Sequence, residues 1–110
     1  MDTYEIRHYL DESGHDLYQD WLKGLRDQVA KVAIIRRVAR ASVGNFGDHK
    51  FLQDGVSELR IDVGPGYRIY YAQVGDKVIL LTHGGDKRKQ TADIAKAIKL
   101  LENWRERNAT

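Results

Sequence analysis

The sequence predicts a single α+β domain with a small, curved and mostly antiparallel sheet. The length of 110 residues is typical of one domain. An N-terminal segment of alternating polarity is followed by two segments with the apolar spacing of a helix. Three further alternating segments and a third helical pattern complete the chain. The order strand, helix, helix, three strands, helix is typical of the α+β class.

The first half of the chain is predicted to form one strand and two helices. Alternation predicts the strand over residues 3–10. A short helix is expected over residues 16–25 and a longer one over residues 27–43, because an aspartate at the start of each can accept hydrogen bonds from the first backbone N–H groups. A glycine follows the longer helix and is expected to end it. Residues 44–55 are predicted to form a loop.

The longer helix is predicted to bury one face and to display arginines on the other. At 100° per residue, its apolar and small residues fall on one side, namely Ile34, Ile35, Val38, Ala39, Ala41 and Ser42. The opposite side carries Arg26, Arg36, Arg37 and Arg40. This stripe is either a solubilising surface or a surface for a partner protein or RNA. In the second case, the residues expected to bind the partner are Arg36, Arg37 and Arg40.

The second half is predicted to form three strands and a closing helix. The strands are expected over residues 56–63, 67–74 and 77–83, with tight glycine-containing turns between them. The helix is expected over residues 90–107, with Thr91 as a candidate cap. Its predicted buried stripe consists of Ile94, Ala97, Ile98, Leu101 and Trp104. The aromatic residues expected in the core are Trp21, Phe46, Phe51 and Trp104.

The turn at residues 64–66 determines which residues share a face of the sheet. A two-residue loop would place Arg68 on the aliphatic face, and burying an unpaired charge there is costly. A three-residue loop pairs Val63 with Tyr67 and lets Gly66 adopt a left-handed conformation. The apolar face then holds Leu59, Ile61, Val63, Tyr67, Ile69 and Tyr71. The polar face holds Glu58, Arg60, Asp62, Arg68 and Tyr70.

The next hairpin extends the polar face into a predicted cationic patch. A two-residue loop at residues 75–76 pairs Val74 with Lys77, and it then places Arg68 opposite His83 and Tyr70 opposite Leu81. Arg68 becomes the centre of an open sheet face. The basic run at the end of the last strand consists of Lys87, Arg88 and Lys89.

Two interpretations of this patch are open. In the first, it is a solvated face on which Asp62 and Arg68 form a cross-strand ion pair. In the second, it recognises phosphate, with arginines as clamps, His83 as a proton carrier and Tyr70 as a platform on which a base stacks. The histidines expected at the surface are His8, His15 and His49.

Composition and motifs exclude several classes of site. The sequence has no cysteine, and no two histidines have the spacing of metal ligands on one element, so no metal is expected. Neither a P-loop nor a GxGxxG motif occurs, so no small-molecule cofactor is expected. No signal peptide or long apolar run is visible, which predicts a cytoplasmic protein away from membranes. Basic residues gather in residues 26–50 and 77–110, which is typical either of a solvated surface of mixed charge, the interpretation that charge alone favours, or of a surface for an anionic partner such as nucleic acid.

Several short motifs in the second half resemble those of a known family. They are GNFGD, ELRI, GPGYR, GGDK and DIAKA. With the element order, they resemble the RelE/ParE superfamily of bacterial toxins, in the HigB-type, phage-derived branch of addiction-module killer proteins. The resemblance implies a RelE-like fold over residues 1–110 and a toxin made with a partner antitoxin, often a helix-turn-helix repressor. It also implies metal-free cleavage of mRNA in the ribosomal A site.

The resemblance also implies roles for single residues. Arg68 matches a phosphate-contacting arginine, Arg88 a second catalytic arginine, and Arg60 approximately the position of a catalytic lysine. The residues expected in catalysis are therefore Arg60, Arg68, His83 and Arg88. Those expected to bind RNA are Tyr70, Lys87 and Lys89.

This sequence departs from the RelE pattern at two positions. Asp62 stands where a second lysine is expected, and Ile94 stands in place of a tyrosine. His83 is therefore our candidate for proton transfer, on the register argument alone. The departures leave two alternatives open. One is a ParE-like toxin that inhibits DNA gyrase without nuclease activity, and the other is a non-catalytic regulatory binding module.

Overall fold

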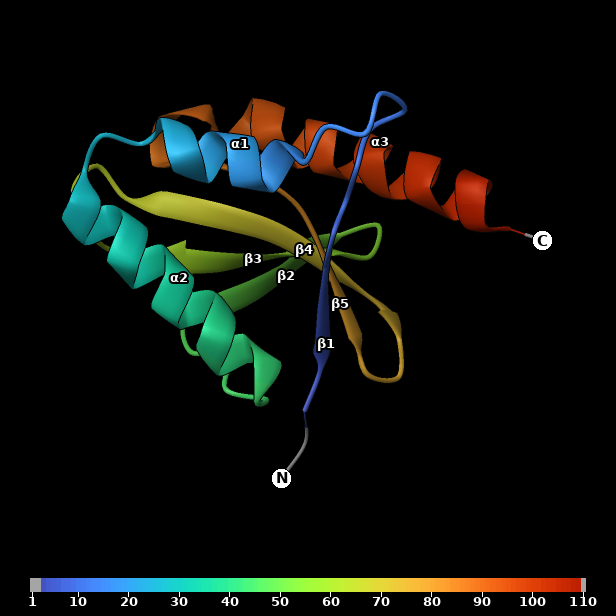
Figure 1. The fold of residues 1–110 in the computed structure, drawn as a ribbon, viewed down its shortest axis with the longest axis horizontal. Coiled ribbons are helices and arrows are strands. Elements are labelled where there is room, and N and C mark those ends of the chain that lie inside the picture. Colours follow the sequence, from blue (N-terminus) through green and yellow to red (C-terminus); the bar gives the residue numbers. More distant parts are fainter. Residues whose placement is uncertain (1–2, 110) are drawn as a thin grey trace.

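The computed structural model describes residues 3–109 and shows an α+β fold with five strands and three α-helices (Figure 1). The elements are β1 (Glu5–His8), α1 (Leu17–Gly24), α2 (Gln28–Ser42), β2 (His49–Gln53), β3 (Val56–Ile61), β4 (Tyr67–Gly75), β5 (Val78–Asp86), the short 3-10 helix η1 (Lys87–Lys89) and α3 (Gln90–Asn108). The α+β class is confirmed. No helix within the described residues is long and apolar enough to cross a bilayer.

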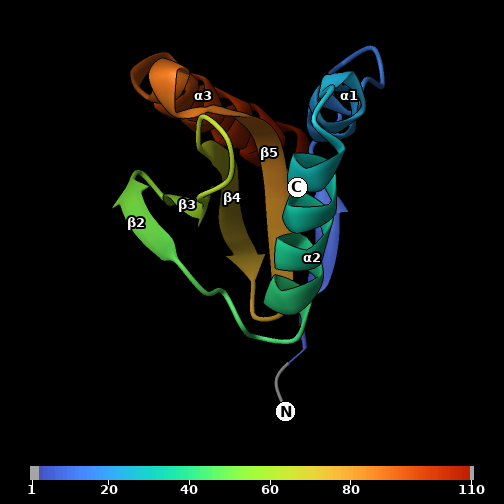
Figure 2. The ribbon, with the colours of Figure 1, turned by 90° about the vertical axis from the view of Figure 1, so that its left-hand side faces the viewer.

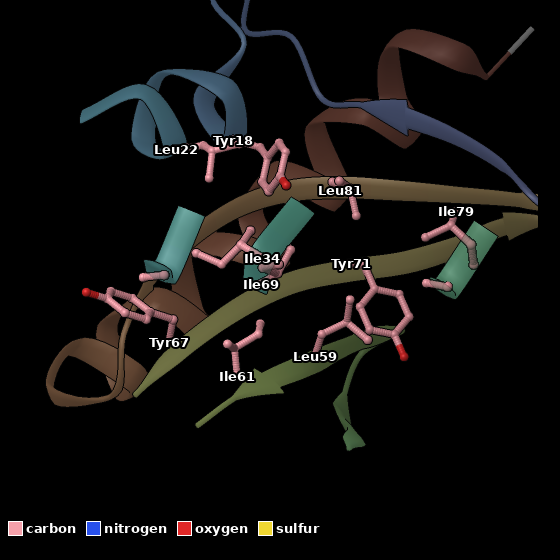
Figure 3. Close-up of a cluster of buried hydrophobic side chains, with 12 residues drawn as sticks. Tyr18, Leu22, Ile34, Leu59, Ile61, Tyr67, Ile69, Tyr71, Ile79 and Leu81 are labelled. Carbon is pink, nitrogen blue, oxygen red and sulfur yellow. The ribbon is translucent and has the colours of Figure 1, made fainter. Parts of the chain in front are cut away.

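The strands form one open sheet in the order β1-β5-β4-β3-β2, with β1 parallel to β5 and every other pair antiparallel. Helices α1 and α2 pack on one face and α3 on the other (Figure 2). The first face carries the larger apolar cluster, in which Ile34 of α2 meets Leu59 and Ile69 of the sheet (Figure 3). The second face carries a smaller cluster beneath α3.

The predicted starts of α1 and α2 are confirmed by their caps. The side chain of Asp16 accepts a hydrogen bond from the Gln19 backbone N–H at 3.0 Å, and Asp27 accepts one from Ala30 at 3.1 Å. The cap predicted for α3 is wrong. Thr91 lies inside that helix, because the turn η1 leads into it from Lys89.

The prediction of a loop over residues 44–55 is wrong, because it contains the edge strand β2, which pairs with β3. The connection between them is a two-residue turn at Asp54 and Gly55, both with positive φ, a pattern that the Asp-Gly dipeptide favours. The prediction that Phe51 is a core residue is also wrong, since its side chain is exposed on β2. Phe46, by contrast, stacks on Tyr71 of the apolar face, 5.7 Å between ring centroids.

The predicted faces of β3 and β4 are correct, although the predicted pairing is not. Ile61 lies opposite Tyr67, so the connecting loop is two residues longer at its start than expected. A shift of two residues leaves every side chain on the same face, which is why the separation of polar from apolar residues survives. Gly66 has the predicted left-handed conformation, with φ of 86°.

The predicted pairing of β4 with β5 is also wrong. Arg68 lies opposite Gly85, and His83 lies opposite Tyr70. The cause is the turn, since Gly75 itself pairs with Val78. Two β-bulges follow along the ladder, at Val74 and at Thr82, and the hydroxyl of Thr82 donates to the Tyr70 carbonyl at 3.2 Å. The two bulges offset each other, so His83 and Gly85 keep the register that the turn sets.

The exposed face of α2 differs from the prediction. Ile35 and Ala39 are exposed although both were expected in the core, and Val29 and Val32 are exposed beside them. The buried residues of the helix are Ala30, Ile34 and Ala41. The exposed surface of α2 is therefore apolar as well as basic.

Candidate functional site

The predicted site residues of β3, β4 and β5 share one face, but that face is not open. Arg60 and Arg68 are direct cross-strand neighbours, and Tyr70 is paired with His83. Helix α3 covers this face, so the prediction of an uncovered patch is wrong. Tyr70 is completely buried and stacks on His83, with ring centroids 5.0 Å apart. Tyr70 is therefore not an exposed platform for a base.

A buried carboxylate lies between the two arginines. The Glu58 side chain is 1% exposed, and its Oε2 is 3.2 Å from Arg60 Nε and 3.6 Å from Arg68 Nε. Gln90 at the start of α3 donates to the other carboxylate oxygen at 2.8 Å. Two guanidiniums side by side repel each other, and an intervening carboxylate offsets that repulsion. Glu58 thus fixes both arginines in place.

The ion-pair partner expected for Arg68 was Asp62, and this expectation is wrong. Asp62 lies in the β3–β4 loop, exposed to solvent, and Glu58 takes that place instead. The sequence does indicate that Glu58 can pair with these arginines. It lies two residues before Arg60, and this spacing puts both side chains on one face of a strand. A carboxylate on the face of two arginines is the expected neutralising group.

The two arginines differ in their access to solvent. The Arg60 side chain is 33% exposed and that of Arg68 is 13% exposed. Arg68 Nη1 donates to the Tyr67 carbonyl at 3.1 Å, which further fixes its guanidinium. Both keep an exposed part that can meet an anion at the edge of α3.

The turn η1 brings Lys87 beside Arg68, and Arg88 and Lys89 follow it along the chain. The Lys87 backbone N–H donates to the Gly66 carbonyl at 2.9 Å, which joins η1 to the β3–β4 loop. The side chain of Lys87 and the Arg68 guanidinium both lie within 4 Å of the position that a Gly66 Cβ would occupy. The structure therefore gathers Arg60, Arg68 and the basic run of η1 at one end of the sheet.

Arg88 of this run points into solvent, with 81% of its side chain exposed. Its guanidinium pairs with Asp86 at 3.0 Å, and the same carboxylate accepts a hydrogen bond from the Arg88 backbone N–H. These hydrogen bonds hold the pKa of Asp86 below its ordinary value. Helix α3 follows with no side-chain cap among the described residues, so its first N–H groups add positive potential here.

His83 belongs to a second, more buried part of the site. Its Nε2 lies 3.4 Å from Asp93 Oδ1 of α3, and its side chain is 4% exposed. Burial lowers the pKa of His83, an effect that Asp93 opposes, so the imidazole is neutral at pH 7. The sequence reasoning missed Asp93. Its spacing of three residues from Gln90 on α3, which places both on one helix face, is the signal that was available.

Two consecutive glycines of β5 explain how close the helices come. A Cβ on Gly84 would lie 2.3 Å from the Trp21 ring of α1, and one on Gly85 would lie 2.1 Å from Asp93 Oδ2 of α3. The two positions face opposite sides of the sheet. Side chains at either position would push a helix away, so the Gly-Gly pair allows both helices to contact the same strand.

Acidification should destabilise the fold through His83. The unfolded chain binds the proton near the ordinary pKa, while the folded pKa is lower, so stability is full above about pH 6.5 and falls as the pH decreases below it. Urea unfolding at pH 7.5 and 5.5 should show a loss of up to about 1.4 kcal/mol per pH unit from this group. The loss should be smaller in His83→Gln and unchanged in His49→Gln, which alters an exposed histidine. If the free energy of unfolding depended on pH equally in His83→Gln and in the parent protein, the assignment of this effect to His83 would be wrong.

Arg37 does not belong to the exposed arginine stripe of α2. It donates to the carbonyls of Phe46 and Asp48, each at 2.9 Å, and to that of Arg60. Burial lowers its pKa. Arg37 therefore joins α2 to the loop before β2 and to the strand of Arg60. The exposed arginines of the helix are Arg36 and Arg40.

The sequence pattern of a described family, "Phage derived protein Gp49-like (DUF891)", matches residues 20–103. The chain belongs to this Gp49-like family. The family lies within the RelE/HigB-like toxin superfamily. A Haemophilus influenzae protein, described only as uncharacterized, is 45% identical over 84 residues, which is 76% of this chain and 84% of the relative.

The Gp49-like match runs from within α1 into α3 and includes every residue of the site just described. It leaves out β1, which contributes none of the candidate residues. Membership of this phage-derived family is compatible with a toxin of a toxin-antitoxin pair, and an antitoxin is the partner that such a family suggests.

Proposed function

We propose that this protein is the HigB-type toxin of a type II toxin-antitoxin pair and that it cleaves mRNA on the ribosome without a metal ion. The observation that carries the proposal is the cluster of Arg60, Arg68 and the η1 cations, in which the buried Glu58 pairs with both strand arginines. Fixed guanidiniums suit a phosphate whose negative charge grows in the transition state, because they need no reorganisation as the reaction proceeds.

In the proposed reaction, the ribose 2′-oxygen attacks the adjacent phosphorus while the bond from phosphorus to the 5′-oxygen breaks. The products are a 2′,3′-cyclic phosphate and a free 5′-hydroxyl. The base takes the 2′-hydroxyl proton, and the leaving 5′-oxygen gains a proton from an acid. Arg60, Arg68 and Arg88 neutralise the phosphate, while Lys87 and Lys89 attract the RNA backbone.

The burial of His83 limits the role that we propose for it in the reaction. A neutral imidazole can accept a proton, but its side chain is too enclosed to touch the ribose. We therefore assign His83 to proton transfer through one bridging water molecule, next to Asp93. Tyr70 has no direct role with RNA in this proposal, and its ring stacks on the ring of His83.

The burial of His83 and Tyr70 favours a second candidate function. It leaves arginine and lysine as the main side chains at the surface of the cluster, and these bind anions well but transfer protons poorly. A ParE-like toxin that inhibits DNA gyrase, or a non-catalytic regulatory binding module, needs nothing more than such a surface.

Induced expression with mapping of RNA 5′ ends separates these functions. The proposed nuclease should produce new 5′-hydroxyl ends within translated mRNA soon after induction. A gyrase inhibitor should instead produce DNA breaks with intact mRNA, and a regulatory module should produce neither. Either of the last two results would overturn the nuclease proposal.

We propose that the helix-turn-helix antitoxin binds the exposed face of α2. Four exposed aliphatic residues gather there, Val29, Val32, Ile35 and Val43, beside Arg36 and Arg40. The helix itself contains no acidic residue. Among residues 3–109, Arg36 and Arg40 form no ion pair. An apolar stripe beside such cations is a suitable surface for an amphipathic segment with acidic flanks.

Charge reversal should therefore weaken this complex. Arg36→Glu or Arg40→Glu should lower the affinity for the antitoxin by roughly tenfold, about 1.4 kcal/mol, as measured by calorimetry. Lys99→Glu, a reversal of the same size on the exposed side of α3, is the matched control and should leave the affinity unchanged. Equal affinity of all three variants would exclude α2 as the interface.

A further inference from the structure

A small cavity of 280 Å³ lies between α1 and α3, where β5 ends. Strand β1 runs beside β5 as far as the pair of His8 and Leu81. Beyond that pair, the stretch from His83 to Asp86 has a strand neighbour on one side only among the described residues. The cavity occupies this uncovered edge of β5.

The walls of the cavity are of three kinds. Trp21 and Leu17 of α1 supply an aromatic and an aliphatic wall. Asp93 supplies a carboxylate, with 14% of its side chain exposed. Lys89 and Lys96 supply cations, and both are exposed. The cavity thus combines a flat apolar wall at Trp21 with a hydrogen-bond acceptor at Asp93. The two lysines lie at its outer rim.

Two buried polar atoms at this cavity have no hydrogen-bond partner within residues 3–109. They are His83 Nε2 and Asp93 Oδ2, and the side chain of His83 is more than nine-tenths buried. A buried polar atom without a partner costs free energy, and such atoms are usually satisfied by water or a ligand. The cavity is therefore suited to a polar ligand and poorly suited to an aliphatic one.

We propose that this cavity binds one unpaired nucleobase, stacked beside Trp21 with its exocyclic amino group toward Asp93. Single-stranded RNA is recognised in this way, by aromatic stacking and by hydrogen bonds to base edges. The inference rests on the proposed action on RNA and names the part of the substrate that the site selects. The cations at the rim suit the phosphates on either side of the base.

The cavity is connected to the arginine cluster through η1. Gly85 lines the cavity and lies opposite Arg68 on the neighbouring strand. Lys87 at the start of η1 lies beside Arg68, while Lys89 at its end lies at the cavity. A nucleotide whose phosphate binds Arg68 can therefore place the neighbouring base between α1 and α3.

The carboxylate predicts which bases bind. Asp93 only accepts hydrogen bonds when ionised, so at position 4 of a pyrimidine it favours the amino group of cytosine over the carbonyl oxygen of uracil. Cytosine and uracil are the matched pair, because they have the same ring and differ only in this group and in the proton that uracil carries on N3. The site should therefore prefer cytosine to uracil, and should also accept the amino-bearing purines.

The test uses ribonucleoside 5′-monophosphates and the fluorescence of Trp21 in a Trp104→Phe protein, which removes the other of the two tryptophans. Cytidine monophosphate should quench this fluorescence at roughly tenfold lower concentration than uridine monophosphate. In Asp93→Asn the two nucleotides should bind equally, because an amide can both donate and accept and so pairs with either base. Glu102→Gln, which changes another carboxylate of α3, should keep the discrimination.

Equal quenching by the two pyrimidine nucleotides would overturn the proposal, as would quenching by inorganic phosphate alone to the same degree. No quenching by any nucleotide would overturn it as well. Because this binding needs no cleavage, the two proposals fail separately. If the protein distinguished the two nucleotides but did not cleave RNA, the base site would be supported and the nuclease proposal would be wrong. If it cleaved RNA but did not distinguish the nucleotides, the nuclease proposal would be supported and the base site would be wrong.

Discussion

Replacement of Arg68 by alanine is expected to reduce RNA cleavage by about a thousandfold and to abolish growth arrest on induction. Its guanidinium is the more buried of the two beside Glu58, and it is fixed by that carboxylate and by the Tyr67 carbonyl. A charge held so firmly stabilises the transition state without first being ordered by substrate. Cleavage rates of a translated mRNA, measured with purified ribosomes, give the size of the effect.

Two further variants make the Arg68 result specific. Arg7→Ala removes an exposed arginine from β1, at the sheet edge remote from β3, and should cleave normally. Arg68→Lys keeps the charge but loses the planar fork, so it should recover only part of the activity. Thermal unfolding of each protein shows whether the fold is kept. Full cleavage by a folded Arg68→Ala protein would remove this arginine from the site.

The faces of the strands could be predicted from sequence, whereas their pairing could not. Burying Arg68 among aliphatic residues would cost several kcal/mol, and this local penalty fixes which side of β4 it occupies. The length of the loop before it depends on a distant contact, the hydrogen bond from Lys87 to the Gly66 carbonyl. The bulge at Thr82 likewise depends on the neighbouring strand. Neither contact leaves a pattern in the local sequence.

The position of α3 over the candidate site could not be predicted from sequence for a related reason. The polar residues near Arg68 suggested a solvated face, but the same face continues into Ala72 and Leu80, which pack under α3. The apolar stripe of that helix was predicted correctly, with Ala97 and Leu101 fully buried. Sequence periodicity shows that a helix has a buried side, but it does not show which face of the sheet receives it. The shared helix face of Gln90 and Asp93 is visible in the sequence, but the position of that face over Glu58 and His83 is not.

The close approach of α1 to β5 makes Gly84 the position where a small change should cost most stability. In Gly84→Ala the new methyl group would lie 2.3 Å from the rigid ring of Trp21, which is itself held by Tyr18 and Tyr67. Overpacking of this kind should lower the free energy of unfolding by about 3 kcal/mol, measured by urea unfolding. Gly85→Ala should cost less, because the atom it meets is the end of the Asp93 side chain, which can rotate away.

Gly24→Ala is the matched control, since a Cβ on Gly24 has nothing within 4 Å. It should leave stability unchanged or raise it by up to about 1 kcal/mol, because alanine restricts the unfolded chain. A smaller aromatic ring should relieve the contact at Gly84, so Trp21→Phe combined with Gly84→Ala should be more stable than the sum of the two single effects predicts. If Gly84→Ala is as stable as Gly24→Ala, then α1 can move away from β5 at little cost. The contact between Trp21 and the β5 backbone would then not hold the wall of the cavity in place.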